Sequence, residues 1–284
     1  MKLIDLRPKR VGADLRGVCQ LGSNVNQNEP EVQTYITGLI TPLSSAQIGR
    51  LNTLVASLKS GLGISALSDA FDTLYVLAGE TSESSLRNLV KNAHYATAVN
   101  SPEFTQFEGF KSNGTSSYIN TNYNAVAHAS KFTLNNASVA YYSTMPNNPG
   151  VISSPLGMRD ISSICGVSIK NSGGACYYIN DISDNLISYN NSLSGLFYIR
   201  RPNNTQKILS KNKNHLSIVD GNSVSSVNYN TYILCRNNTG SAERFWIGNI
   251  SFVLIGRYFT DQEADAITDS IEAYMDSNGK GVIA

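Results

Sequence analysis

Two segments of the chain, residues 44–60 and 260–278, carry apolar residues at the spacing of one helix face. Each opens with a capping-box sequence, Ser44-x-x-Gln47 in the first and Thr260-x-x-Glu263 in the second. In this motif, side chains satisfy the free N–H groups of the first helical turn. Residues 84–91 have apolar positions on one side and predict a third, shorter helix, whereas the apolar run 74–77 predicts a buried strand.

From residue 104 onward, short runs rich in Tyr, Phe, Val and Ile alternate with turns rich in Asn, Gly and Ser. About ten short strands are expected, among them 104–110, 132–134, 161–169, 175–180 and 244–255. Alternation places Ala137, Val139 and Tyr141 on one face of a strand. The pattern predicts a mainly β protein: an antiparallel β-sandwich or jelly roll with short N-terminal helices and a C-terminal helix.

The composition and charge of the chain argue against several classes of protein. Charged residues make up 15% of the 284 residues, well below common usage, and Asn and Ser together supply about a quarter of the chain. The net charge of +1 does not suit a nucleic-acid-binding protein that works by neutralising phosphates. No run of 18 apolar residues predicts a membrane span, and the N-terminus lacks the apolar segment of a secretory signal.

The cysteines and histidines do not predict a cross-link or a metal centre. Cys165 and Cys176 flank a turn at residues 171–174, and hairpin register would place their sulfurs too far apart to bridge. Cys19 and Cys235 lie far from both in sequence, and we expect four buried, free thiols. The three histidines show no spacing typical of zinc ligands.

Three stretches carry a resemblance to a known group of proteins. They are residues 100–110 (NSPEFTQFEGF) leading into 113–121 (NGTSSYINT), residues 235–240 (CRNNTG), and residues 250–257 (ISFVLIGR) leading into 259–263 (FTDQE). Together they resemble the concanavalin A-like lectin/glucanase superfamily, in the laminin-G-like form found in bacteriophage virion proteins. The resemblance covers residues 44–284 and is more specific for the fold than for function.

The resemblance implies a division of the chain and a role. Residues 44–284 would form the lectin-like jelly-roll domain, with a helical N-terminal portion at 44–100 and the C-terminal helix at 260–278. Residues 1–43 would be an arm that anchors the protein to other virion proteins. We expect a non-enzymatic structural protein of a bacteriophage virion (a head fibre, decoration, collar or tail-associated component), assembled in the host cytoplasm as a homo-oligomer, with a trimer suiting a fibre.

Some members of this superfamily hydrolyse glucans with acids spaced Glu-x-Asp-x-x-Glu on a strand. The nearest match here is Glu263-Ala264-Asp265, but Thr268 replaces the third acid and the residues fall on a predicted helix. Residues two apart diverge on a helix, so they cannot form the paired carboxylates that glycoside hydrolysis needs. A glycoside hydrolase or lyase therefore ranks behind two binding roles, the virion protein and a stand-alone carbohydrate-binding module.

Loops rich in Asn and Tyr are the candidate glycan contacts, because amides bond sugar hydroxyls and aromatic rings pack on sugar faces. The same residues also serve turn geometry, which is their commoner use. The candidates are Asn122, Tyr123, Asn124, Tyr189, Asn190, Tyr229 and Asn230.

Trp246 lies in a predicted strand, where a core position is expected. No resident cofactor is predicted. Calcium is an open alternative, because some laminin-G-like domains bind it with a loop Asp. Asp160, Asp181, Asp184 and Asp220 could contribute, but no loop carries a dense set of carboxylates.

Overall fold

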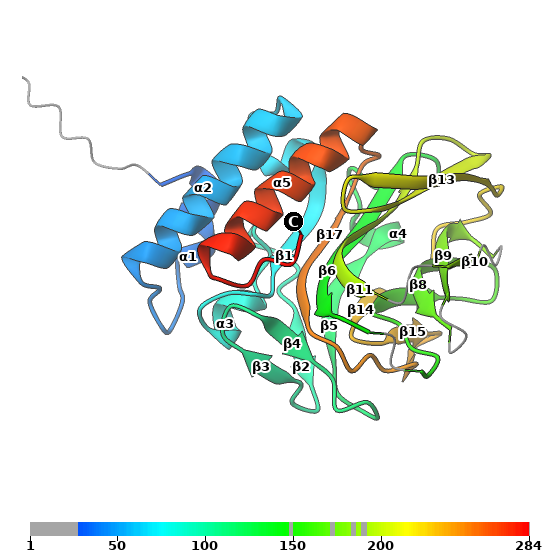
Figure 1. Cartoon of the computed structure of the whole chain (residues 1–284), viewed down its shortest axis with the longest axis horizontal. Helices are drawn as coiled ribbons and strands as arrows, with labels where there is room; N and C mark the ends of the chain where they lie inside the picture. Colours follow the sequence, from blue (N-terminus) through cyan, green and yellow to red (C-terminus); the bar gives the residue numbers. More distant parts are fainter. Residues whose placement is uncertain (1–27, 148–149, 171–173, 183–185, 189–191, 284) are drawn as a thin grey trace, which may run out of the picture.

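The structure is a computed structural model that describes residues 28–147, 150–170, 174–182, 186–188 and 192–283. Helices pack on one side of a β-sandwich, so the molecule has three layers (Figure 1). No helix in these described ranges is long and apolar enough to cross a bilayer. The fold class predicted from the sequence is confirmed: two sheets form a mainly antiparallel sandwich with N-terminal helices and a C-terminal helix.

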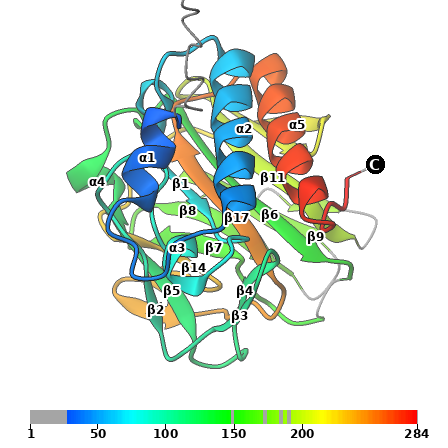
Figure 2. The same cartoon turned by 90° about the vertical axis from the view of Figure 1, so that its left-hand side faces the viewer.

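The helical layer consists of three helices that come from both ends of the described chain. They are α1 (Pro30–Ile36), α2 (Ser45–Leu62) and α5 (Asp261–Ser277). Figure 2 shows α2 and α5 side by side across one face of the sandwich. The short helical turns η1 (Leu67–Asp69), α3 (Ser82–Ser85) and α4 (Ala125–His128) lie in connections.

Sheet A is the middle layer and follows the order β13-β12-β11-β6-β17-β4-β3, with β1 also paired to β17. Its strands are β1 (Phe71–Val76), β3 (Glu103–Thr105), β4 (Gly109–Lys111), β6 (Ala137–Met145), β11 (Leu193–Arg201), β12 (Gln206–Lys211), β13 (Asn214–Asp220) and β17 (Ile250–Gly256). The strands that pair come from distant parts of the chain, as β1 and β17 do.

Sheet B is the outer layer and follows the order β10-β9-β8-β7-β14-β5-β2. Its strands are β2 (Thr97–Val99), β5 (Tyr118–Asn124), β7 (Leu156–Arg159), β8 (Ile164–Ile169), β9 (Gly174–Asp181), β10 (Leu186–Ser188), β14 (Asn230–Ile233), β15 (Arg236–Asn238) and β16 (Ser241–Glu243). β15 runs parallel to β7, and β16 forms a hairpin with β15.

Sheet A is buried on both faces. Val139 and Tyr141 of β6 point into the core between the sheets, while Ala140 and Tyr142 point into the core under the helices. The predicted shared face of Ala137, Val139 and Tyr141 is confirmed. Both faces are apolar because each has a layer to pack against. None of the described helices packs on the outer face of sheet B, and the candidate site lies on this face.

The two helices predicted from capping boxes are confirmed. Thr260 and Glu263 make the reciprocal bonds of a capping box at the start of α5. At α2, Ser44 Oγ accepts the N–H of Gln47 at 3.2 Å. The Gln47 amide donates instead to Tyr274 Oη at 2.6 Å, so this side chain joins α2 to α5 rather than completing a capping box.

The helix predicted at residues 84–91 is wrong beyond its first turn, since α3 ends at Ser85. The Leu89 N–H donates to the Leu74 carbonyl at 2.8 Å, and the buried Asn88 side chain accepts the Leu74 N–H at 3.1 Å. The segment therefore pairs with β1, and tertiary hydrogen bonds outweigh the local helical pattern.

Three predicted strands also differ from the structure. The segment 104–110 is a hairpin of β3 and β4, and residues 132–134 contribute only an isolated bridge at Thr133. Only the second half of the predicted strand 244–255 is a strand, because Arg244 has a φ of 57° and β17 begins at Ile250. Trp246 lies in the irregular segment before β17 and is fully buried, which confirms its predicted core position but not its predicted strand.

Asn113-Gly114 makes the expected tight turn, with Gly114 at a φ of 82°. This turn joins β4 of sheet A to β5 of sheet B and does not close a hairpin within one sheet.

The cysteines are free and buried at the three described positions, Cys165, Cys176 and Cys235. Cys165 lies in the core between the sheets, whereas Cys176 lies in a small cluster on the opposite face of sheet B. The prediction that the two cannot bridge is confirmed. Cys19 lies outside the described residues.

An ion network fixes the two sheets to each other inside the sandwich. Asp181 of β9 accepts hydrogen bonds from Arg201 of β11 at 2.9 Å and from Lys207 of β12 at 2.8 Å. All three side chains are fully buried. Asp181 was expected in a loop, but it lies on a strand of sheet B and pairs with two strands of sheet A.

Candidate functional site

A hollow of about 350 Å³ opens on the outer face of sheet B, which none of the described helices covers. We call it the basic pocket, because cationic side chains dominate its lining. The lining residues are Arg159, Asp160, Ile161, Ile164, Lys170, Tyr178, Ile182, Arg236 and Arg244.

The strand order of sheet B brings this lining together. Arg159 ends β7, Tyr178 lies on β9, and Arg236 begins β15. Because β15 pairs in parallel with β7, Arg236 lies beside the outward face of β7 although 77 positions separate it from Arg159. Lys170 follows β8, and Arg244 follows β16.

Two glycines leave the hollow open. Gly157 of β7 is paired with Gly166 of β8, and Gly166 is paired with Tyr178 of β9. By the alternation of these strands, all three occupy the outward face. A Cβ atom at Gly166 would lie 2.5 Å from Gly157 Cα and 2.6 Å from the Leu156 carbonyl oxygen. The strands therefore approach closely at these two glycines, which lie on the same face as Tyr178 of the pocket lining.

The arginines of the basic pocket lie close enough to repel one another. Burial lowers the pKa of Arg236, and the neighbouring charges of Arg244 and Arg159 lower it further, while Glu243 opposes the shift. Glu243 accepts a hydrogen bond from Arg236 Nε at 2.8 Å. Among the described residues, four cations and two carboxylates, Asp160 and Glu243, give the region an excess of positive charge, although the whole chain carries only +1.

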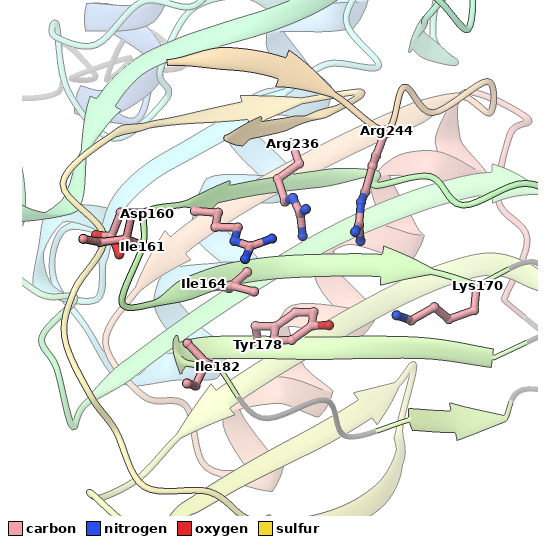
Figure 3. Close-up of a pocket in the computed structure, with 9 residues that line it drawn as sticks. Asp160, Ile161, Ile164, Lys170, Tyr178, Ile182, Arg236 and Arg244 are labelled. Carbon is pink, nitrogen blue, oxygen red and sulfur yellow. The ribbon is translucent and has the colours of Figure 1, made fainter. Parts of the chain in front are cut away.

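The side chains of the basic pocket differ in how they are held. Arg236 is almost fully buried by its contact with Glu243, whereas Arg244 is about one third exposed and donates to Ser168 Oγ at 3.1 Å. Arg159 is partly exposed. Figure 3 shows the ends of Arg236, Arg244 and Lys170 directed toward the hydroxyl end of Tyr178. With 2% of its surface exposed, Tyr178 forms the floor of the pocket.

The loops predicted to contact glycan use their side chains within the protein. Asn124 donates to Asn228 Oδ1 at 2.9 Å, so the loops at residues 122–124 and 228–230 do meet. Tyr123, however, is fully buried and bonds Asp72 Oδ2 at 3.2 Å, so its ring cannot pack on a sugar. The Asn122 amide donates to the Tyr95 carbonyl at 2.8 Å and is equally occupied.

Of the remaining candidates, Tyr229 packs against the core between the sheets and the Asn230 amide donates to Asn120 Oδ1 at 3.2 Å. Tyr189 and Asn190 lie outside the described residues. The sequence analysis missed the basic pocket, because its cations come from four separate segments. Arg236 stands in the stretch CRNNTG, which was interpreted as a marker of the fold and not as part of a binding site.

Two of the four residues considered for calcium, Asp160 and Asp181, have other partners in the structure. No group of three or more His, Cys, Asp or Glu side chains in the described part of the chain is placed to hold a metal ion. Asp181 is neutralised by Arg201 and Lys207, and Asp160 lines the basic pocket. Asp184 is outside the described residues.

A serine, a histidine and an aspartate lie in line at the other sheet. Ser210 Oγ is 3.0 Å from His215 Nδ1, and His215 Nε2 is 3.2 Å from Asp265 Oδ1. Ser210 is fully buried and accepts a hydrogen bond from Arg200 at 2.8 Å. A substrate therefore cannot reach its oxygen, and we interpret the cluster as a connection between β12, β13 and α5.

Glu263 and Asp265, the nearest match to the glucanase acids, each have a different partner in this part of the structure. Both residues lie on α5, where Glu263 binds Arg257 and Asp265 contacts His215. The two carboxylates have separate partners and do not face a common cavity.

No protein-family model matches the chain, and no curated protein matches it in sequence. Among solved structures, a Trypanosoma rangeli sialidase mutant with trans-sialidase activity is similar over 83% of this chain and 40% of its own, with a TM-score of 0.54 and 12% identity. The same sialidase in complex with sialic acid is similar over 89% of this chain and 38% of its own, with a TM-score of 0.52 and 12% identity.

A carbohydrate-binding module of a Ruminococcus gnavus sialidase, bound to α2,3-sialyllactose, is similar over 47% of this chain and 81% of its own, at a TM-score of 0.35 and 18% identity. The chain spans about 40% of the length of the Trypanosoma rangeli sialidase. At 12% identity, the two matches to the Trypanosoma rangeli sialidase concern the fold alone, and they agree with the β-sandwich architecture that the sequence predicts.

Proposed function

We propose that this domain binds an acidic carbohydrate in the basic pocket and does not cleave it. The observation that carries the proposal is the convergence of Arg159, Lys170, Arg236 and Arg244 around one hollow. Concentrated positive charge on an otherwise nearly neutral protein creates a local field that attracts anionic ligands. The hollow, at about 350 Å³, is within the size range of ligand pockets.

Guanidinium groups supply the chemistry of recognition. An arginine presents a rigid fork of N–H donors that matches a carboxylate or a sulfate in two parallel hydrogen bonds. Arg159 and Arg244 are the more exposed of the three arginines, so they are the ones we assign to direct contact with the acid group. Arg236 is buried and paired with Glu243, so we assign it to the positive charge of the pocket and not to direct contact with the ligand.

The absence of catalysis is part of the proposal. Glycoside hydrolysis ordinarily requires two carboxyl groups that flank the glycosidic bond. The carboxylate lining the described pocket is Asp160, whose Oδ1 already accepts the N–H groups of Ser162 and Ser163, each at 2.8 Å. This supports binding over bond cleavage.

Calorimetric titration tests the proposal with trigalacturonate as the acidic probe and maltotriose as the neutral one. We expect binding of trigalacturonate only, weakened by salt because the ligand is held by exposed charges. Arg159→Gln should lose at least tenfold in affinity, since a hydrogen bond to a charged group contributes about 1.5–3 kcal/mol.

Arg50→Gln is the matched control, because Arg50 is also partly exposed but lies on α2 in the helical layer. Equal binding of maltotriose, or unchanged affinity in Arg159→Gln, would contradict the assignment of the site. Release of shorter sugars from trigalacturonate would contradict the non-catalytic part.

We propose further, on the sequence resemblance alone, that the protein is a structural component of a bacteriophage virion and forms a homo-oligomer. In the structure, Val32, Tyr35 and Leu43 belong to the core under the helices. A deletion that tests anchoring should therefore end at residue 27, so that this core stays intact. Loss of the truncated protein from purified particles would support the role, and normal incorporation would contradict it.

A further inference from the structure

Three aliphatic side chains project from the surface beside the basic pocket. Ile161 is 94% exposed, Ile182 is 59% exposed and Val224 is 50% exposed. Ile161 and Ile182 both line the pocket. The Val224 N–H donates to the Asn180 carbonyl at 2.8 Å, which keeps it near Ile182. We call these three residues the aliphatic rim.

Ile161 is held rigidly in its exposed position. It lies in the tight turn between β7 and β8, where Asp160 Oδ1 accepts the N–H groups of Ser162 and Ser163. The Asp160 N–H also donates to the Ser163 carbonyl at 3.0 Å. Turn positions favour Gly, Asn, Asp and Ser, and grouped exposed aliphatic residues mark binding surfaces more often than isolated ones do.

The isoleucines of the basic pocket are grouped together. In Figure 3, Ile161, Ile164 and Ile182 lie toward one end, where Asp160 also lies, and Arg236, Arg244 and Lys170 lie toward the other, with Tyr178 between them. An occupant complementary to both ends carries negative charge beside apolar surface. A free acidic sugar provides the negative charge but is too polar to cover the aliphatic rim.

We propose that the acidic sugar is the head group of a membrane glycolipid, and that the aliphatic rim enters the boundary between head groups and acyl chains. This inference rests on the proposed function of the basic pocket. Exposed aliphatic residues next to a cationic surface are the combination by which proteins attach to anionic bilayers. Ile161 supports a bilayer over a small ligand, because its side chain extends outward instead of forming a closed wall.

Vesicle co-sedimentation tests the proposal with the full-length protein. The probes are phosphatidylcholine vesicles alone, or with glucuronosyl diacylglycerol, with neutral glucosyl diacylglycerol, or with phosphatidylglycerol. We expect strong binding only to vesicles with glucuronosyl diacylglycerol. Ile161→Ser should weaken this binding at least tenfold, equivalent to about 1.4 kcal/mol. Val224→Ser, at a rim residue outside the pocket lining, should also weaken vesicle binding and leave trigalacturonate affinity unchanged.

Ile40→Ser is the matched control, because Ile40 is 89% exposed but precedes α2 on the helical side of the molecule. Its vesicle binding should equal that of the wild type.

The outcomes separate the two proposals. If trigalacturonate binds but glucuronosyl vesicles do not, or if Ile161→Ser binds vesicles like the wild type, the membrane inference fails and the sugar site stands. Equal binding to phosphatidylglycerol vesicles would overturn the glycolipid assignment. If neither the soluble acid nor the glucuronosyl vesicle binds, the proposed function itself fails.

Discussion

Replacing Asp181 by Asn should destabilise the sandwich more than most single substitutions. Asp181 Oδ2 is the shared acceptor for Arg201 and Lys207, and no part of the three side chains is exposed. Asp181→Asn removes the only negative charge of this trio and leaves two buried cations. Breaking a buried ion pair by removing one partner costs about 3–5 kcal/mol.

The other hydrogen bonds of Lys207 and Arg201 determine how much stability each variant of the network should lose. Lys207 Nζ also donates to the Tyr177 carbonyl at 2.9 Å, and Arg201 Nε donates to the Ile179 carbonyl at 2.8 Å. Lys207→Met keeps the pair of Asp181 and Arg201, so it should cost less than Asp181→Asn. The double variant should lose less free energy of unfolding than the two single variants lose together, by about 1–3 kcal/mol, because the residues act as one network.

Urea denaturation followed by Trp246 fluorescence measures these free energies, since Trp246 is fully buried. The melting temperature of Asp181→Asn should fall by roughly 6–20 °C for a protein of this size. A loss below about 1 kcal/mol, or strictly additive effects in the double variant, would refute the reasoning that the carboxylate neutralises both cations.

The same variant should respond to pH. Burial lowers the pKa of Lys207, and the Asp181 carboxylate opposes that shift. Without the carboxylate the pKa of Lys207 falls further below its value in the unfolded chain. The folded state then binds fewer protons than the unfolded state, so the stability of Asp181→Asn should rise with pH more steeply than that of the wild type between pH 7 and about 10.

Three further predictions concern other layers of the fold. Gly166→Ala should cost about 1–3 kcal/mol and weaken acid binding, because its Cβ would meet Gly157 Cα at 2.5 Å at a φ of 141°. Gly49→Ala is the control, because no atom lies within 4 Å of a Cβ built at Gly49, and it should not destabilise α2. Equal falls in the melting temperatures of the two variants would contradict the close approach of the strands at Gly166.

Burial raises the pKa of Glu263, but hydrogen bonds from Arg257 and the Thr260 N–H outweigh it and leave the pKa below its ordinary value. The wild type should therefore have a larger free energy of unfolding than Glu263→Gln, and this difference should be complete above about pH 4.3 and decline below it. A difference that grows as the pH falls would contradict this reasoning. Thr260→Ala should cost about 1 kcal/mol by loss of the helix cap, measured by urea denaturation, and no loss would exclude the capping role.

Much of the fold could be predicted because its signals are local. The capping box of Thr260 and the apolar stripe that follows determine α5 through contacts within a few residues. The alternation in residues 137–141 fixes which side chains share a face. The helix predicted at 84–91 failed where Asn88 and Leu89 bond to Leu74 of β1, a contact that no local pattern reports.

The candidate site could not be predicted because it depends on strand order. The sequence predicted glycan contacts in the loops where Asn and Tyr cluster, but the side chains of Tyr123 and Asn122 make hydrogen bonds within the protein. Nothing in the sequence marks Arg159 and Arg236 as neighbours, and it is the parallel pairing of β15 with β7 that brings them together.

The amino-acid sequence alone determined the class of fold, the positions of its long helices and the burial of Trp246, because periodicity and capping act over short distances along the chain. Only the tertiary structure decided that sheet A is covered on both faces, that Asp181 joins the two sheets, and that four cations meet beside an aliphatic rim. Pairings between distant strands are selected by packing of the whole domain, and the side chains they bring together carry no signal of their own in sequence.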